Sequence, residues 1–184
     1  MRWDKFFDDL AGQASSAMGA ELLGEVEERS RDEVGRLSLA TRLAGSGAHP
    51  LTVDLVDGGS VTGRPLDVGD GWLCLASAAD EVIVPLPALA GIRWATRVSG
   101  AADGSPGASG FGLRPVLRAL VRRRVYVRLS TRGGSTAGGT LEGVGADHVE
   151  LAEHPADRPR RADEVRAFRL VPFDALLTVR YASD

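Results

Sequence analysis

The sequence predicts an α+β protein that is mainly β: an N-terminal helical segment, then two five-stranded barrels in tandem, each preceded by a helix. Two observations carry this prediction. Most of the chain consists of short alternating segments separated by glycines, which is typical of small barrels. In addition, residues 84–94 return in degenerate form as residues 171–181, with shared valine-proline, alanine-leucine and arginine-aromatic pairs. The repeat indicates two copies of one β unit.

Residues 1–45 are predicted to be helical, because apolar side chains recur there at every third or fourth position. Residues 25–33 contain opposite charges four positions apart, which suits a solvated helix face. A Gly-Ser-Gly sequence at 45–47 ends the pattern. We expect this helix either to pack on the chain's own barrels or to dock on another protein. The docking residues of its apolar end would be Trp3, Phe6, Phe7 and Leu10.

The first barrel is predicted over residues 46–98. Residues 51–55 alternate between apolar and polar side chains, as in a half-buried strand, and the Asp-Gly-Gly sequence at 57–59 predicts a hairpin turn. Four further strands are expected over residues 61–67, 72–75, 81–84 and 89–94. Residues 99–110, which are rich in glycine, serine and alanine, are predicted to be a flexible linker.

The second barrel is predicted over residues 111–184. It begins with a helix at 113–123, whose apolar residues share one face. The strands that follow match the first copy as three segments: 133–134 with 58–59, 139–145 with 63–69, and 148–151 with 72–75. The copies differ mainly at residues 152–167, where the second has a polar loop with several arginines.

The composition excludes several classes of protein. No apolar run approaches the ~20 residues of a membrane span, and acidic residues stand where a signal peptide would be apolar. We therefore expect a cytoplasmic protein without membrane association. The single cysteine, Cys74, excludes an intrachain disulfide and a cysteine-based zinc site. His49, His148 and His154 are too scattered for a metal site, and no nucleophile stands in a catalytic pattern. We predict no enzyme activity, no metal and no cofactor.

Positive charge is concentrated in the second copy. The chain has a net charge of −3, yet residues 111–184 contain 13 arginines and 9 acidic residues. Lysine occurs once, a usage typical of GC-rich bacterial genomes. Arginines four residues apart line one helical face and could follow a phosphate backbone; the alternative is a solvated face that pairs with residues 25–33. The predicted nucleic-acid surface comprises Arg114, Arg118, Arg122, Arg123, Arg124, Arg128, Arg158, Arg160 and Arg161.

A helix followed by five strands, with a short turn before an Ala-Leu strand, resembles the Sm-like fold, whose bacterial branch is the Hfq family. Residues 51–58 look like the family's first strand and turn, and residues 84–92 look like its junction between strands four and five. The resemblance implies barrels that pair edge to edge through strands four and five, often into rings. It also implies an association with RNA. The chain contains no asparagine, so we place the RNA contact on the arginines and not at the family's base-reading amides.

These observations predict a non-catalytic binding protein that associates with RNA through its basic C-terminal barrel. The alternative is a scaffold or assembly adaptor, which would bind a protein partner or a second copy through the N-terminal helix and the barrel edges. The first reading depends on the arginines of the second copy, and the second depends on the apolar residues near the N-terminus.

Overall fold

The computed structural model describes residues 38–47, 49–78, 80–94, 108–156, 161 and 163–183. They belong to the compact unit Leu39–Asp184, apart from Ser38. The predicted helical segment before residue 38, with its contact residues Trp3, Phe6, Phe7 and Leu10, lies outside the described residues.

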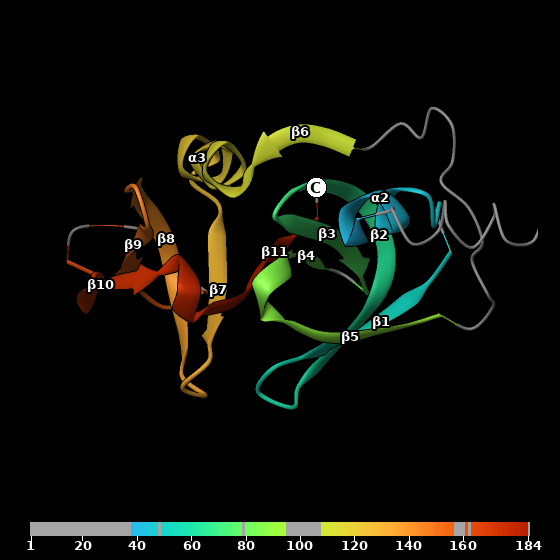
Figure 1. Ribbon diagram of the computed structural model, residues 1–184. Helices are drawn as coiled ribbons and strands as arrows, with labels where there is room; N and C mark the ends of the chain where they lie inside the picture. Colours follow the sequence, from blue (N-terminus) through green and yellow to red (C-terminus); the bar gives the residue numbers. More distant parts are fainter. Residues whose placement is uncertain are drawn as a thin grey trace, which may run out of the picture. The chain divides into compact units, whose positions relative to one another are not determined.

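The unit contains two sets of five strands, each with a helix before it along the chain (Figure 1). The first set follows a short helix, and its elements are α2 (Leu39–Ala44), β1 (Leu51–Leu55), β2 (Ser60–Asp70), β3 (Trp72–Ser77), β4 (Asp80–Pro85), η1 (Leu86–Ala88) and β5 (Leu89–Trp94). The second set follows a short strand and a longer helix. Its elements are β6 (Ala108–Gly112), α3 (Leu113–Arg123), β7 (Tyr126–Thr131), β8 (Thr136–Val144), β9 (His148–Glu153), β10 (Ala167–Pro172), η2 (Phe173–Ala175) and β11 (Leu176–Ala182).

All these strands belong to one sheet of eleven strands. Its main path runs β10-β9-β8-β7-β11-β4-β3-β2-β1-β5, and β6 pairs with β2 in parallel. The order β5-β1-β2-β3-β4 in the first repeat therefore recurs as β11-β7-β8-β9-β10 in the second. The two repeats are joined where β4 pairs antiparallel with β11, in a register that places Ile83 opposite Val179. This contact joins the fourth strand of the first repeat to the fifth strand of the second.

The prediction of two closed five-stranded barrels, each preceded by a helix, is wrong. Closure would join the fourth strand of each repeat to its own fifth strand, but β4 pairs with β11 of the other repeat, and β9 is the only described strand that pairs with β10. The result is one open sheet, and α2 and α3 are the only α-helices among the described residues. Alternation in the sequence specifies which residues form a strand and which face they present, but not which strand lies next to it.

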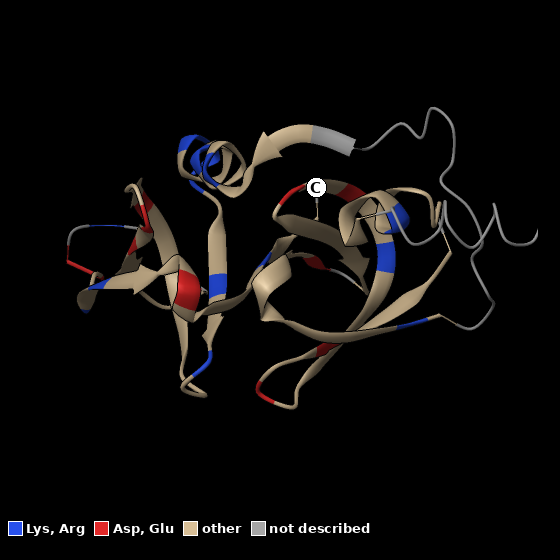
Figure 2. Cartoon of the chain, viewed as in Figure 1, with Lys and Arg blue, Asp and Glu red and all other residues tan. Residues whose placement is uncertain are grey.

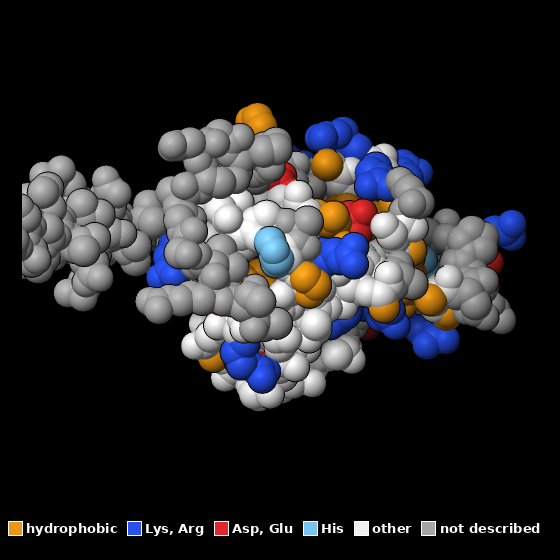
Figure 3. Space-filling model, turned by 90° about the vertical axis from the view of Figure 1, so that its right-hand side faces the viewer, with side chains coloured by type: hydrophobic (Ala, Val, Ile, Leu, Met, Phe, Trp, Pro, Cys, Tyr) orange, Lys and Arg blue, Asp and Glu red, His pale blue; other side chains and the backbone are white. Residues whose placement is uncertain are grey.

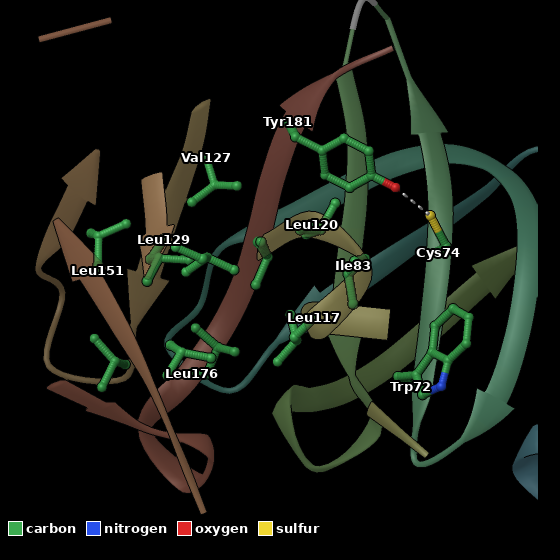
Figure 4. Packing of buried hydrophobic residues seen from close by; sticks show 14 residues of the cluster. Trp72, Cys74, Ile83, Leu117, Leu120, Val127, Leu129, Leu151, Leu176 and Tyr181 are labelled. Atoms are coloured by element: carbon green, nitrogen blue, oxygen red, sulfur yellow. Dashed lines mark hydrogen bonds between the residues drawn. The ribbon is translucent and has the colours of Figure 1, made fainter. Parts of the chain in front are cut away.

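The strands β3 and β4 are buried on both faces, because they lie in the middle of this sheet. Leu73 and Leu75 point into one core, which they share with β1 and α2. Trp72, Cys74 and Ile83 point into a second core, which also contains residues of α3 and of the second repeat. Figure 4 shows this second core, with side chains from both repeats in contact. Burial on both faces accounts for the continuous apolar run at residues 72–75, where a half-exposed strand would alternate.

Helix α3 matches the predicted span of residues 113–123. Its buried residues Leu117 and Leu120 belong to the second core. The helix ends at Arg124, whose backbone adopts the left-handed conformation (φ 52°) that commonly closes a helix. Residues 108–110 of the predicted linker form the first part of β6.

The first hairpin turn of each repeat contains a glycine with positive φ. The values are 88° at Gly58 and 75° at Gly134. The amide of Gly58 donates to the carbonyl of Leu55, and the amide of Gly134 donates to the carbonyl of Thr131, at 3.0 and 2.9 Å. Gly58 therefore corresponds to Gly134, one residue away from the match expected from the sequence.

Candidate functional site

Five arginines at α3 form an exposed surface, which we call the basic face: Arg114, Arg118, Arg122, Arg123 and Arg124. The first three lie four residues apart, while the alternate stripe of Leu117 and Leu120 packs into the second core. Figure 2 shows the concentration of positive charge on this helix. An amphipathic helix thus holds the guanidinium groups on its solvent side, as the sequence predicted.

Of the remaining predicted arginines, the structure describes Arg128 and Arg161. Arg128 on β7 forms an ion pair with Asp80 on β4, with 3.0 Å between Nη2 and Oδ2. It therefore links the two repeats. Arg161 is exposed in the loop between β9 and β10. Arg158 and Arg160 lie outside the described residues, so their predicted role remains a prediction.

A hollow of about 440 Å³ lies next to the basic face, between α3 and β8. Arg122 and Arg124 line it together with Thr140 and Glu142. Tyr126, the aromatic residue nearest to these arginines in the sequence, does not line it. The Tyr126 ring instead packs edge-on against His154, at 5.4 Å between ring centroids. The polar groups that line this hollow are therefore two guanidinium groups, one hydroxyl and one carboxylate.

A second polar group lies at the seam, by which we mean the β4–β11 junction of the two repeats. The hydroxyl of Tyr181 on β11 donates to Glu81 Oε2 on β4 at 2.6 Å. The same hydroxyl lies 4.0 Å from Cys74 Sγ on β3, the contact drawn in Figure 4. Ser183 also donates to Glu81, at 3.2 Å. This network joins residues about one hundred positions apart in the sequence, so no local pattern could have identified it.

Burial controls the protonation of this network. It raises the pKa of the Cys74 thiol to about 11, and the nearby carboxylates of Glu81 and Asp67 act in the same direction. Burial also raises the pKa of Tyr181, and the hydrogen bond to Glu81 adds to the effect. Both groups are therefore protonated at neutral pH. Cys74 lacks the thiolate that nucleophilic chemistry requires.

The histidines have local hydrogen-bond partners. His154 is buried, with its Nε2 atom 2.8 Å from the hydroxyl of Thr140 and its Nδ1 atom 2.9 Å from the carbonyl of Pro155. His148 Nδ1 lies 2.8 Å from a carboxylate oxygen of its neighbour Asp147. In the part of the chain that the structure describes, no three His, Cys, Asp or Glu side chains form a group that could hold a metal ion. No described helix is long and apolar enough to cross a membrane.

Among the described strands, β5 and β10 lie at the two ends of the main path of the sheet. On β10, Phe168 and Leu170 are exposed to 64% and 63%, which is unusual for large apolar side chains. Figure 3 shows one face of the molecule, where the hydrophobic side chains drawn in colour lie as separate small groups with arginines between them. Phe168 and Leu170 thus expose large apolar side chains on a strand at one end of the sheet's main path.

No family model and no curated protein matches this chain.

Proposed function

We propose that the protein binds RNA through the basic face of α3. The observation that supports this function is the exposure of the five clustered arginines, three of them in line along one helix. Guanidinium groups bind phosphate oxygens in bidentate geometry. A row of them suits a polyanionic backbone better than it suits an isolated ligand.

The basic face favours recognition of the phosphate backbone over recognition of base sequence. No asparagine exists in the chain to read base edges, and Tyr126 packs against His154. We therefore expect affinity with little sequence preference and with strong salt dependence. The carboxylate of Glu142, beside Arg122 and Arg124, moderates the local positive potential.

Charge reversal on the helix tests this proposal. The Arg118→Glu/Arg122→Glu variant should weaken binding to a fluorescein-labelled single-stranded RNA by at least about tenfold at low salt, because each phosphate contact adds to the affinity. The matched control is Arg42→Glu/Arg64→Glu, which makes the same charge change at two exposed arginines of the first repeat. Equal losses in both variants, with unchanged circular dichroism, would show that net charge and not the basic face governs binding.

A second candidate function is assembly of copies through the two end strands of the sheet. The position of these edge strands favours it. The strands β4 and β11, which pair at the seam, are the fourth strand of one repeat and the fifth strand of the other. In the same way, β10 is the fourth strand of the second repeat and β5 is the fifth strand of the first. The exposed side chains of Phe168 and Leu170 lie on one of these edges. Pairing of β10 with β5 of a second copy would continue the sheet and cover unpaired backbone groups.

Sedimentation analysis across a range of protein concentrations tests this assembly. The wild-type chain should form oligomers, and Phe168→Lys/Leu170→Lys should shift the mass toward the monomer, because charged residues on an edge strand oppose pairing. A wild-type chain that stays monomeric at all concentrations would exclude assembly while leaving the RNA proposal intact.

A further inference from the structure

A pocket of about 370 Å³ lies at the seam, and we call it the seam pocket. Its volume falls in the range of small-molecule sites, which is about 300–1,000 Å³. Both repeats contribute to it: Trp72 and Glu81 come from β3 and β4, and Tyr181 comes from β11. The inner side of α3 closes it with Val116 and Ala119. The pocket exists only because the two repeats share one sheet.

Most of its wall is apolar. Trp72 is almost completely buried, with 2% exposure, and its indole Nε1 donates to the carbonyl of Phe111 at 2.9 Å. This bond fixes the ring. At the rim, Leu66 and Phe111 are exposed to 49% and 66%. Large apolar side chains that remain exposed around a concave apolar surface are typical of a binding site.

Two half-buried carboxylates, Asp67 and Glu81, supply the charge of the pocket. An ionised carboxylate accepts hydrogen bonds and donates none. Glu81 already accepts from the hydroxyls of Tyr181 and Ser183, and Asp67 accepts from the amide of Val68 at 2.8 Å. All these donors are neutral. In the described part of the chain, no ion pair joins an arginine to either carboxylate, whereas Asp54, Asp80 and Glu153 each have one.

We propose that the seam pocket binds a small organic cation with an apolar body, of the class of arylalkyl amines. The ammonium group would donate to Asp67 and Glu81 and so add a charged donor to the neutral donors that these carboxylates have in the described part of the chain. The apolar body would lie against Trp72 and Val116. The rings of Trp72 and Tyr181 also offer faces that attract a cation. Neutral or anionic compounds of the same shape would lose the charged contact.

This site is independent of the proposed RNA function. The seam pocket uses the side of α3 that carries Val116 and Ala119, whereas Arg118 and Arg122, the arginines changed in the RNA test, are exposed and do not line it. Loss of RNA binding would leave the amine proposal untouched, and the converse also holds.

The test uses three probes of matched shape: 4-phenylbutylamine, 4-phenylbutanol and 4-phenylbutyrate. Each is titrated into the full chain while the indole N–H signal of Trp72 is followed by NMR, assigned with Trp3→Phe and Trp94→Phe variants. The amine should give a saturable shift of this signal at concentrations up to ~10 mM, and the alcohol and the acid should bind at least about tenfold more weakly, as expected when one charge-assisted hydrogen bond is lost.

Substitutions test whether the two carboxylates and the volume of the seam pocket are needed for amine binding. Asp67→Asn and Glu81→Gln should each weaken amine binding by about tenfold, and both keep an oxygen that can accept the existing hydrogen bonds. Ala119→Leu should block binding by filling the pocket, and leucine suits a helix. The control, Asp174→Asn, removes the same charge from an exposed residue of η2 and should bind like the wild type.

Three results would overturn the proposal. The first is the absence of a saturable shift at Trp72 with the amine. The second is equal affinity for the amine and the alcohol, which would show a hydrophobic pocket without cation selectivity. The third is the same loss of affinity in Asp174→Asn as in Asp67→Asn, which would attribute the effect to net charge.

Discussion

Two glycines at matching positions let the second and third strands of each repeat approach closely. A Cβ atom at Gly63 would overlap the carbonyl oxygen of Ala76, and one at Gly139 would overlap the carbonyl oxygen of Ala152. Both obstacles are backbone atoms of the neighbouring strand, which cannot rotate away as a side chain can. The same requirement in both repeats supports the internal repeat at the level of single residues.

Substitution of one of these glycines should destabilise the protein. Gly139→Ala should lower the free energy of unfolding by about 1–3 kcal/mol, the usual cost of forcing extra atoms into a packed site. Urea denaturation measures it. The control is Gly133→Ala, because a Cβ at Gly133 meets nothing within 4 Å. If both variants were equally stable, strands β8 and β9 would have to be farther apart than described.

The buried thiol of Cys74 gives a pH prediction. Its pKa is raised from 9.0 to about 11 in the folded state, so folding favours the protonated form. The contribution of this group is complete below pH 9 and is lost as the pH rises through 11. Denaturation curves give the free energy of unfolding of wild type and of Cys74→Ala. The difference between these two free energies should change by up to about 2 kcal/mol between pH 8 and pH 11. A difference that stays constant over this range would contradict the burial of the thiol.

At the scale of elements, the two 3₁₀ turns are joined by one side chain. Arg132, in the turn after β7, donates through Nε to the carbonyl of Asp174 in η2 and through Nη2 to that of Pro87 in η1, both at 2.6 Å. The planar guanidinium can serve both acceptors at once, which an ammonium group on a lysine chain cannot do with the same geometry. In each repeat, a 3₁₀ turn connects strand four to strand five. Arg132 thus connects the turn of one repeat to the turn of the other.

Removal of these two hydrogen bonds should destabilise the seam. Arg132→Ala should reduce the free energy of unfolding by about 1–2 kcal/mol, since two charge-assisted hydrogen bonds are lost at an exposed position. Arg132→Lys should recover only part of it. Chemical denaturation is the measurement, with Arg64→Ala as an exposed arginine outside the seam. Full recovery by lysine would show that charge alone, without the two-acceptor geometry, is enough.

Individual elements were predictable from the sequence, and their partners were not. Strand β5 and helix α3 lie where the periodicity placed them, because alternation and helical spacing are local signals. The pairing of β4 with β11 joins residues about one hundred positions apart, so closed barrels were expected instead. The continuous apolar run at residues 72–75 was the available signal of a strand buried on both faces.

The same reasoning applies to the candidate sites. The exposure of Arg114, Arg118 and Arg122 followed from their spacing of four residues, on the face opposite the buried leucines. The seam pocket could not be predicted, because Asp67, Glu81 and Phe111 lie in separate parts of the sequence and meet only through the shared sheet.

At the scale of the whole molecule, the two repeats form one folding unit. The second core combines Trp72 and Ile83 of the first repeat with Leu129 and Val179 of the second. The first core in turn includes Leu177 of β11. Neither core is complete within a single repeat, so neither repeat can unfold without exposing apolar surface of the other.

Calorimetry should therefore show one cooperative transition for the unit formed by the repeats. Ile83→Ala should lower the midpoint of that transition as a whole, by an amount that corresponds to about 2–4 kcal/mol, because it leaves a cavity in the shared core. Two separate transitions, only one of which moves in the variant, would show that the repeats are independent domains.

The central claim of the account is that the basic face binds the phosphate backbone of RNA. The most direct measurement is the slope of log K against log salt concentration for a labelled single-stranded RNA, compared between wild type and Arg118→Ala/Arg122→Ala. Each phosphate contact contributes about 0.7 to the slope, so the double variant should have a slope smaller by about 1.4. Identical slopes in both proteins, or no binding at ~50 mM salt, would contradict the claim.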